Sequence, residues 1–310
     1  MQICFLGTIL KKTSERCEGL MLNMLQRPKR VAAIQDLSGF GRCSLTVIIP
    51  ILSSMGIQVC PVPTTILSTH TGGLQTPVFL DLTDYVSQSL AHYRQIGVEF
   101  ESVYTGFLGS EGQIDHCLAY FAAYPDAFLV VDPVMGDEGK TYKTYTPEMV
   151  RRMAELVAKA DMITPNLTES CILLGEAYPA SPITRSQAKS MLVRLSEKGP
   201  KIVVVTGVHF ADGTLANIGY EREKNAFWSV SCRYVPVKYP GTGDAYTSTL
   251  LGALLGGESL PAAMERATRF LETAIKTTYG YGSDPRHGVM LEMVLHELSS
   301  QEPMAGYQIL

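Results

Sequence analysis

Short runs of apolar, β-branched residues alternate with helical patterns along most of this 310-residue chain. The run Lys201–Thr206 is almost entirely apolar, and Val31–Gln35 and Ala127–Val131 have the same character. Strands that are apolar on both faces belong at the centre of a parallel sheet, because helices cover both of its sides. The alternation therefore predicts an α/β fold with a mostly parallel central sheet that is flanked by helices on both faces.

Two segments depart from this alternation. Gly213–Tyr220 and Ala226–Arg233 flank a short polar stretch, which predicts a short antiparallel hairpin at one end of the sheet. No linker, repeat or low-complexity tract divides the chain, so we expect a single domain over residues 29–299. We expect residues 1–28 to be a poorly ordered N-terminal extension and residues 300–310 to be a C-terminal tail.

The remaining patterns define the other expected elements. Strands are predicted at Val31–Gln35, Ile57–Pro63, Glu101–Thr105, Ala127–Val131, Met162–Thr164 and Lys201–Thr206. Helices are predicted at Ser44–Met55, Asp84–Ile96, Gly112–Ala123, Pro147–Ala158, Ser186–Glu197, Asp244–Leu255, Pro261–Thr278 and Met290–Leu298. Ligands of such sheets bind beyond the carboxyl ends of the strands, which is where the informative residues of this sequence lie.

Charge and cysteine usage exclude several classes of protein. The 26 basic and 30 acidic residues give a net charge of -4, whereas a nucleic-acid binder is expected to show a basic excess. No apolar run approaches the length of a membrane helix, and the first residues lack the cationic start of a signal peptide. The seven cysteines are odd in number and show no Cys-x-x-Cys pair, which fits a reducing cytoplasm. We expect neither a nucleic-acid nor a membrane partner.

The most informative motif is Gly241-Thr242-Gly243-Asp244, directly before a helix with an apolar face. The free amides and the dipole of a helix N-terminus bind anions, and glycines let the backbone approach a phosphate closely. A carboxylate beside that anion site is useful if it accepts a proton from an attacking hydroxyl. The motif therefore indicates phosphoryl transfer to an alcohol, with Asp244 as the base. The alternative is that Asp244 only stabilises the helix N-terminus.

Acidic residues follow two other predicted strands. Asp132 and Asp137 come after Ala127–Val131, and carboxylates at a strand end suit Mg²⁺, although a plain turn is an equal alternative. Asn166 and Glu169 have the spacing of an N-cap and its third helical residue, so a capping box is a rival to a metal role. Such a cap would leave Glu169 at the helix start, unable to reach a metal-bound water as well.

Two glycine-containing stretches invite a ligand-binding interpretation. The Gly-Phe-Gly stretch at 39–41 resembles a dinucleotide fingerprint, but Ser44 occupies the third glycine position and the next acidic residue is Asp81, so we exclude it. His70–Gly73 follows a predicted strand, and a hydroxyl beside two glycines could bind a small polar ring. The alternative for that segment is a turn with a core histidine.

In this order, the motifs resemble those of the pyridoxal kinase branch of the ribokinase-like superfamily, over about Val31–Leu298. The stretches Asp132–Asp137 and Gly241–Asp244 carry the resemblance, together with Thr164-Pro165-Asn166 and the following Glu169. The loop Ser68–Gly72 looks like the ring-binding segment of that family, and Phe107 follows a strand end where the family has an aromatic residue facing the ring. The resemblance implies a ribokinase-like kinase domain.

The resemblance implies ATP-dependent phosphorylation of the 5′-hydroxymethyl group of a vitamin B6 vitamer (pyridoxal, pyridoxamine or pyridoxine) in pyridoxal 5′-phosphate salvage. It implies Mg²⁺, a cytoplasmic homodimer and, in many members, a monovalent cation such as K⁺. The resemblance implies Asp244 as the base, with the amides of Gly241, Thr242 and Gly243 as the anion site, and it implies Asp132 and Glu169 as the Mg²⁺ ligands. The residues implied around the vitamer are Asp36, Ser38, Thr71, Gly72, Phe107 and Asp244. Those implied around ATP are Asp132, Thr164, Asn166, Glu169, Thr206, Val235, Tyr239 and Thr242. The stretch Glu138–Thr146 matches a flap over ATP, in which Lys140 and Lys143 either contact phosphates or are solvated.

One departure from the family pattern concerns the acceptor site. Family members usually follow the first strand with Gln-Ser-His, whereas this chain has Gln35-Asp36-Leu37-Ser38. Either Asp36 or Ser38 takes the ring-contact position, and we hypothesise that Asp36 faces the substrate. A carboxylate there would favour a cationic partner, such as an aminomethyl group or a protonated ring.

Two alternatives to a B6 kinase remain open. The nearer one is a hydroxymethylpyrimidine kinase of thiamine synthesis, although such enzymes often carry Cys where this chain has Asp244. The other is a non-catalytic vitamer-binding protein on a kinase fold. The coexistence of Asp132, Glu169 and Asp244 favours an enzyme, because a binding protein needs neither a base nor a metal site.

Overall fold

The computed structural model describes residues 27–299, 304 and 306–310. Most of the N-terminal extension expected at 1–28 therefore lies outside the described residues. Within them, one sheet of ten strands has the order β12-β11-β10-β9-β8-β5-β4-β1-β2-β3. Its strands are β1 (Arg30–Phe40), β2 (Gln58–Thr69), β3 (Phe79–Asp81), β4 (Ser102–Thr105), β5 (Phe128–Val131), β8 (Met162–Ile163), β9 (Ile202–His209), β10 (Leu215–Glu221), β11 (Ala226–Ser231) and β12 (Gln308–Ile309).

The middle of the sheet is parallel and its ends are antiparallel. Strands β2, β1, β4, β5, β8 and β9 pair in parallel, as the sequence predicted. The predicted hairpin is β10–β11, which pairs antiparallel to β9. At the far edge, β12 comes from the segment that the sequence analysis placed in the C-terminal tail. At the other edge, the short strand β3 pairs antiparallel to β2.

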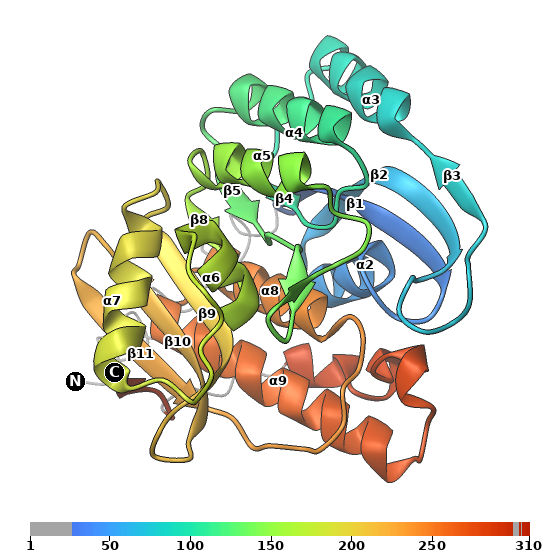
Figure 1. Cartoon of the computed structure of the whole chain (residues 1–310). Coiled ribbons are helices and arrows are strands. Elements are labelled where there is room, and N and C mark those ends of the chain that lie inside the picture. The colour runs from blue at the N-terminus through green and yellow to red at the C-terminus, as the bar shows by residue number, and fades with distance from the viewer. Residues whose placement is uncertain (1–26, 300–303, 305) are drawn as a thin grey trace, which may run out of the picture.

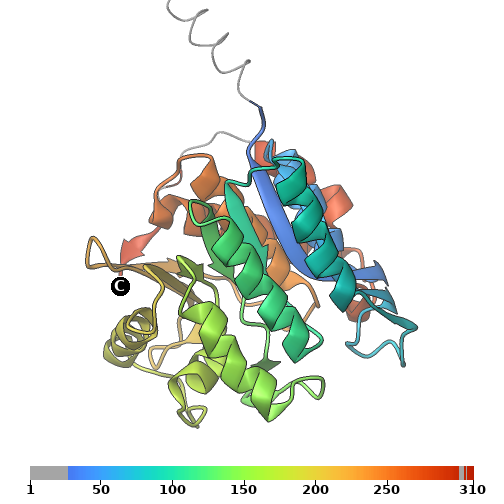
Figure 2. The ribbon, with the colours of Figure 1, turned by 90° about the horizontal axis from the view of Figure 1, so that it is seen from above.

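Helices cover both faces of the sheet (Figures 1 and 2). One face carries α3 (Thr83–Gln95), α4 (Glu111–Ala123), α5 (Pro147–Val157), α6 (Leu167–Leu174) and α7 (Arg185–Ser196), and the other carries α2 (Leu45–Ser54), α8 (Thr242–Leu255) and α9 (Leu260–Gly280). In β1, Ala32 and Ile34 pack into the first layer, while Val31 and Ala33 pack into the second. This alternation explains why the central strands are apolar on both faces. None of the helices in the described ranges is long and apolar enough to span a membrane.

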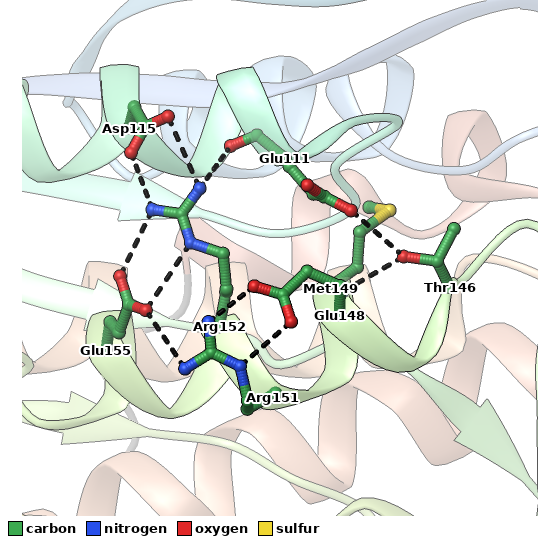
Figure 3. Close-up of polar contacts among 8 residues, drawn as sticks. All are labelled: Glu111, Asp115, Thr146, Glu148, Met149, Arg151, Arg152 and Glu155. Carbon is green, nitrogen blue, oxygen red and sulfur yellow. Dashed lines mark hydrogen bonds and ion pairs between the residues drawn. The ribbon is translucent and has the colours of Figure 1, made fainter.

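Polar contacts fix α4 and α5 against each other on the outer surface (Figure 3). Arg152 of α5 pairs with Asp115 of α4 at 2.5 Å and with Glu155 at 3.1 Å. Thr146 caps α5 by accepting the Met149 amide at 3.0 Å. Exposed ion pairs contribute little to stability. We therefore assign these contacts a role in aligning α4 with α5, and none in ligand binding.

Several predicted elements differ from the structure, and β2 ends at Thr69 where the sequence predicted Pro63. β1 continues through Phe40, where the sequence predicted a loop after Gln35, because Leu37 and Ser38 pair with β2 beyond an extra residue of β2 opposite Asp36. The helix predicted at Met290–Leu298 was wrong: Leu291–Met293 and Leu295–Ser299 form separate 3₁₀ turns. Leu291 and Leu298 of these turns, and Val294 between them, are buried against α2 and α9, so the apolar spacing does report burial although no α-helix forms.

Candidate active site

A cavity of about 690 Å³ opens at the carboxyl ends of the parallel strands. The predicted site residues that line it are Asp36, Thr71, Gly72, Phe107, Asp132, Thr164, Asn166, Glu169, Thr206, Tyr239, Gly241, Thr242, Gly243 and Asp244. Within the described residues, the lining does not include Ser38 or Val235. At this edge, where ligands of open α/β sheets bind, predicted residues from seven separate segments thus come together.

The turn before α8 forms one wall of this cavity. Gly241 is the N-cap of α8 and has a φ of 77°, which favours glycine. A Cβ at this position would overlap the carbonyl oxygen of Arg42, so two turns from distant parts of the chain are in close contact there. Residues 241–243 line the cavity at the positive end of the α8 dipole, an arrangement that suits an anion.

Asp244 lies in the first turn of α8 and faces the same space. Its Oδ2 accepts the backbone amide of Ser44 at 2.7 Å. Burial raises the pKa of Asp244 to about 6, an effect that the Ser44 amide opposes and that the nearby Asp36 carboxylate reinforces. A carboxylate with a pKa close to neutrality is suited to remove a proton at physiological pH.

Asp132 and Glu169 also line the cavity, and both are buried. Burial raises the pKa of Asp132, and the charges of Glu169 and Asp244 raise it further. Burial also raises the pKa of Glu169, against the lowering effect of backbone amides. The site therefore concentrates negative charge, and a cation would relieve it.

The side chains of this site fit Mg²⁺ only if water and phosphate oxygens supply the remaining ligands. Among the described residues, no three His, Cys, Asp or Glu side chains come together to hold a metal. Mg²⁺ commonly takes one or two carboxylates and completes its shell with water and phosphate oxygens. Asp132 and Glu169 match that pattern.

The rival interpretation of Glu169, a capping box, is present. The Glu169 amide donates to Asn166 Oδ1 at 2.9 Å, and the Asn166 amide donates to Glu169 Oε2 at 2.9 Å. The other oxygen of Glu169 accepts the Met135 amide at 3.1 Å. The cap nevertheless leaves the carboxyl group in the cavity lining, so capping and facing the site are compatible here.

The segment expected to form a flap is partly a small hairpin. β6 (Gly136–Asp137) pairs with β7 (Lys140–Thr141), and Lys143 beyond it lines the cavity. Asp137 also lines the cavity, and its carboxylate pairs with Lys238 at 3.2 Å. Sequence reasoning missed Lys238, because the stretch around it has no strand or helix pattern that would place it opposite the hairpin.

At the opposite end of the cavity, Asp36 rather than Ser38 faces the interior. The register between β1 and β2 shifts between Gln35 and Leu37, because two residues of β2, Thr64 and Thr65, lie opposite the single residue Asp36. Ser38 is buried below and donates its hydroxyl to Asp36 Oδ2 at 2.9 Å. Burial raises the pKa of Asp36, and hydroxyl donors from Ser44 and Ser38 oppose that rise.

His70 is held in one tautomer beside Asp36. Its Nδ1 accepts the Gly72 amide at 3.0 Å, and its Nε2 lies 2.6 Å from the carbonyl oxygen of Arg286. Since a carbonyl only accepts, Nε2 carries the proton and the ring is neutral. The predicted turn with a core histidine therefore forms the wall of the cavity beside Asp36. Phe107 lines the same cavity.

Sequence reasoning also missed Cys43 and Ser44, which line the same cavity as Asp36. Ser44 has a φ of 53°, a conformation that costs a non-glycine residue roughly 1–3 kcal/mol. The available signal was a serine at a position where a strand-turn-helix would ordinarily place glycine.

The chain is similar to known proteins over most of its length. A family model described as phosphomethylpyrimidine kinase matches residues 49–289. A crystal structure of a putative phosphomethylpyrimidine kinase from Bacteroides thetaiotaomicron, in a form with pyridoxal, is 46% identical; the match covers 91% of this chain and 100% of that one, with a TM-score of 0.86.

Curated relatives fall into two groups. Pyridoxal kinase PdxY of Deinococcus radiodurans is 28% identical over 272 residues, which are 83% of this chain and 89% of that protein. The thiamine biosynthesis multifunctional protein ThiED of Corynebacterium glutamicum is 26% identical over 288 residues, which are 90% of this chain and 36% of that protein. Relatives of both kinds thus share most of the length of this chain.

Proposed function

Since the chain belongs to the phosphomethylpyrimidine kinase family of ribokinase-like kinases, we propose that it transfers the terminal phosphoryl group of ATP to the 5′-hydroxymethyl group of a vitamin B6 vitamer. The observation that carries the proposal is the position of Asp244, between an acceptor end and a nucleotide end of one cavity. Asp36, Thr71 and Phe107 line the first end. Thr164, Thr206 and Tyr239 line the second.

The proposed reaction is a direct transfer. Asp244 accepts the proton of the acceptor hydroxyl while the oxygen of that hydroxyl forms a bond to the terminal phosphorus of ATP. The bond between that phosphorus and the leaving ADP oxygen breaks. The amides of residues 241–243 stabilise the charge that develops on the phosphoryl oxygens. Asp132 and Glu169 would hold Mg²⁺, which neutralises phosphate charge when bound. Asn166 and Thr242 belong to the nucleotide end in this proposal.

The choice of a B6 vitamer has specific support. The pyridoxal-bound Bacteroides protein matches nearly the whole described chain at 46% identity. The neutral His70 and Phe107 form walls that suit a flat ring. The second candidate is a hydroxymethylpyrimidine kinase of thiamine synthesis, which the family description and the Corynebacterium relative favour. Asp244 in place of Cys argues for the B6 assignment.

The proposal also covers the setting of the enzyme. We place a single kinase domain at 29–299, acting as a cytoplasmic homodimer. The cysteines in the described ranges are all free thiols, which is consistent with a reducing compartment. Sedimentation of the purified chain tests the dimer, and turnover in K⁺ against Na⁺ tests a monovalent cation requirement.

The deciding experiment measures ADP release with ATP and Mg²⁺. Pyridoxal, pyridoxine, pyridoxamine and hydroxymethylpyrimidine are offered in parallel to the wild type and to Asp244→Asn. Turnover of a B6 vitamer that the variant loses supports the proposal. Turnover of the pyrimidine alone assigns the chain to thiamine synthesis, and tight vitamer binding without turnover makes it a binding protein.

A further inference from the structure

Negative charge dominates the lining of the cavity. Five carboxylates line it: Asp36, Asp132, Asp137, Glu169 and Asp244. Across the described part of the chain, the lining holds two cationic side chains, Lys143 and Lys238, because the ring of His70 is neutral. The polyphosphate of a nucleotide is strongly anionic, and basic side chains are its usual protein partners. These two lysines are therefore the side chains that can offset the charge of ATP.

Lys238 belongs to the loop that leads into the α8 turn. The hydroxyl of Thr242 donates to the carbonyl oxygen of Tyr239 at 3.1 Å, which ties this loop to the start of α8. Tyr239 is buried, whereas the Lys238 side chain is 69% exposed although it lines the cavity. The ammonium group of Lys238 therefore lies at the open rim, close in sequence to a helix N-terminus that favours anions.

Two carboxylates of the β6–β7 hairpin hold Lys238 from the other side. Its Nζ lies 3.2 Å from Asp137 Oδ2 and 2.6 Å from Glu138 Oε1. Directly before these residues, the carbonyl oxygen of Gly136 accepts the side-chain amide of Asn166 at 2.8 Å. Lys238 therefore lies at the Asn166 end of the cavity, which the proposed function assigns to the nucleotide.

The two lysines differ in how they are held. Within the described residues, Lys143 forms no hydrogen bond or ion pair, so no partner directs it toward the cavity. Lys238 is directed by two partners, and all three side chains are exposed: 69% for Lys238, 51% for Asp137 and 72% for Glu138. Ion pairs this exposed contribute little to stability. A phosphate oxygen accepts a charge-assisted bond from an ammonium group, so it can replace one of these carboxylates at little cost.

We propose that Lys238 binds the polyphosphate of the donor nucleotide, exchanging the carboxylates of Asp137 and Glu138 for a phosphate oxygen. The proposal rests on the function proposed above and deepens it, because it adds a cation to the nucleotide end of the cavity. It makes two predictions of opposite sign. Loss of Lys238 weakens nucleotide binding, and loss of a competing carboxylate strengthens it.

The first test measures binding without any acceptor. Calorimetric titration with AMP-PNP, an ATP analogue that does not transfer its terminal phosphoryl group, is compared with titration by adenosine, which carries no phosphate. Mg²⁺ is present in both. We expect Lys238→Met to raise the Kd of AMP-PNP about five- to tenfold and to leave that of adenosine unchanged. Lys238→Arg keeps the positive charge and should bind AMP-PNP more tightly than Lys238→Met.

Lys201 provides a matched control. Its Nζ also lies near two carboxylates, Glu223 at 3.6 Å and Asp161 at 4.0 Å, and its side chain is 54% exposed. It directly precedes β9, so it lies at the amino ends of the parallel strands, whereas the cavity opens at their carboxyl ends. Lys201→Met therefore removes the same charge without touching the site, and we expect no change in either Kd.

The second test removes a partner of Lys238 instead of the lysine. Asp137 lines the cavity itself, so Glu138 is the partner to change. We expect Glu138→Gln to lower the Kd of AMP-PNP about two- to threefold, because a single carboxylate then competes for Lys238. In the Lys238→Met background, the same change should have no effect. This comparison distinguishes competition for the lysine from the general loss of a negative charge.

Three results would overturn the proposal. An AMP-PNP affinity of Lys238→Met equal to that of the wild type would show that the lysine does not contact phosphate. Equal weakening of adenosine and AMP-PNP would mean that the substitution acts on the adenine through Tyr239. A gain from Glu138→Gln of the same size in both backgrounds would exclude competition for Lys238.

The binding measurements also separate this proposal from the proposed function. A wild-type chain that binds AMP-PNP but phosphorylates none of the four acceptors contradicts the vitamer assignment, and the titrations still decide the role of Lys238. A wild-type chain that does not bind AMP-PNP overturns both.

Discussion

The hydroxyl of Thr247 lies 3.4 Å from Oδ2 of Asp132 and 3.0 Å from Oγ1 of Thr164. Thr247 is one turn beyond Asp244 on α8, and it is fully buried. Among the described residues, it is the side chain that donates to Asp132. One hydroxyl thus joins the helix that carries the proposed base to the strand end that carries the proposed metal site.

Replacing Thr247 by valine should weaken the use of Mg²⁺. The variant keeps the shape of the side chain but leaves the Asp132 carboxylate without its donor. The loss of such a hydrogen bond, about 1 kcal/mol, predicts an apparent KM for magnesium-ATP about fivefold higher. Thr247→Ser retains the hydroxyl and should remain close to wild type. Equal losses in both variants, or Mn²⁺ binding measured without ATP that does not change in the valine variant, would contradict this role.

Asp244→Asn should abolish turnover while stabilising the fold. Loss of a general base costs about 10²- to 10⁴-fold in rate. Burial has raised the pKa of Asp244 to about 6, so its charged form is disfavoured in the folded protein at pH 8. A neutral amide avoids that cost, and we expect a gain of about 1–3 kcal/mol in the free energy of unfolding. Chemical denaturation at pH 8 measures the gain, and a destabilised variant would show that the Ser44 amide outweighs burial.

The ligand-free protein should become less stable as the pH rises from about 4 to 8. Burial raises the pKa values of Asp132, Glu169 and Asp244 above those of the unfolded chain. Carboxyls whose pKa is raised by folding contribute stability below their unfolded pKa, and this contribution is lost as the pH passes through the folded pKa. Tm measured against pH should show this decline, with a shallower slope in Glu169→Gln. A Tm that rises across this range in the wild type would contradict the raised pKa values of these three carboxyls.

The raised pKa of Asp244 also predicts how turnover depends on pH. Only the ionised form of Asp244 accepts a proton, so kcat/KM should rise with pH and level off above about 6, the raised pKa of this group. Steady-state rates between pH 5 and 8, with the ionic strength held constant, provide the profile. A rate that is independent of pH below 6 would exclude Asp244 as the base.

Gly241→Ala should be severely damaging. The φ of 77° strains any side chain, and the added Cβ would overlap the Arg42 carbonyl. We expect a loss of about 2–4 kcal/mol in stability, with kcat lost in whatever folds. Gly257→Ala is the matched control, because Gly257 also has a positive φ of 92° but no atom lies within 4 Å of the added Cβ. Similar losses in both variants would mean that φ alone, and not the contact with Arg42, decides the cost.

The parallel core could be predicted because its signal is local. Val203, Val204 and Val205 face alternate helix layers, so an unbroken apolar run reports burial on both sides. The extension of β1 could not be predicted, since Gln35–Ser38 is polar and the strand is completed by β2. In the same way, Leu291 and Val294 have helical spacing and are buried, yet the chain forms two 3₁₀ turns on either side of Val294.

The site was predictable where a residue follows directly from its strand or helix. Asp132 comes after a strand and Asp244 opens a helix, so topology alone brings them to one edge. Ser44 could not be assigned a role, because its value depends on a contact with Asp244, 200 residues further along the chain. Val235 was assigned by resemblance alone, and it does not line the cavity of the described residues.

The contact between Ser44 and Asp244 also constrains how the protein is made. A ribosome releases Ser44 among the first segments of the sheet and Asp244 only after every parallel strand has emerged. Until α8 docks, the second helix layer lacks a central member, and the strand faces that Leu250 and Leu251 cover remain open to solvent. Because contacts so distant in sequence form late, a nascent chain carries apolar surface but no base geometry during most of its synthesis. A truncated chain that ends before Gly241 would therefore be an aggregation-prone folding intermediate, not a partly active kinase.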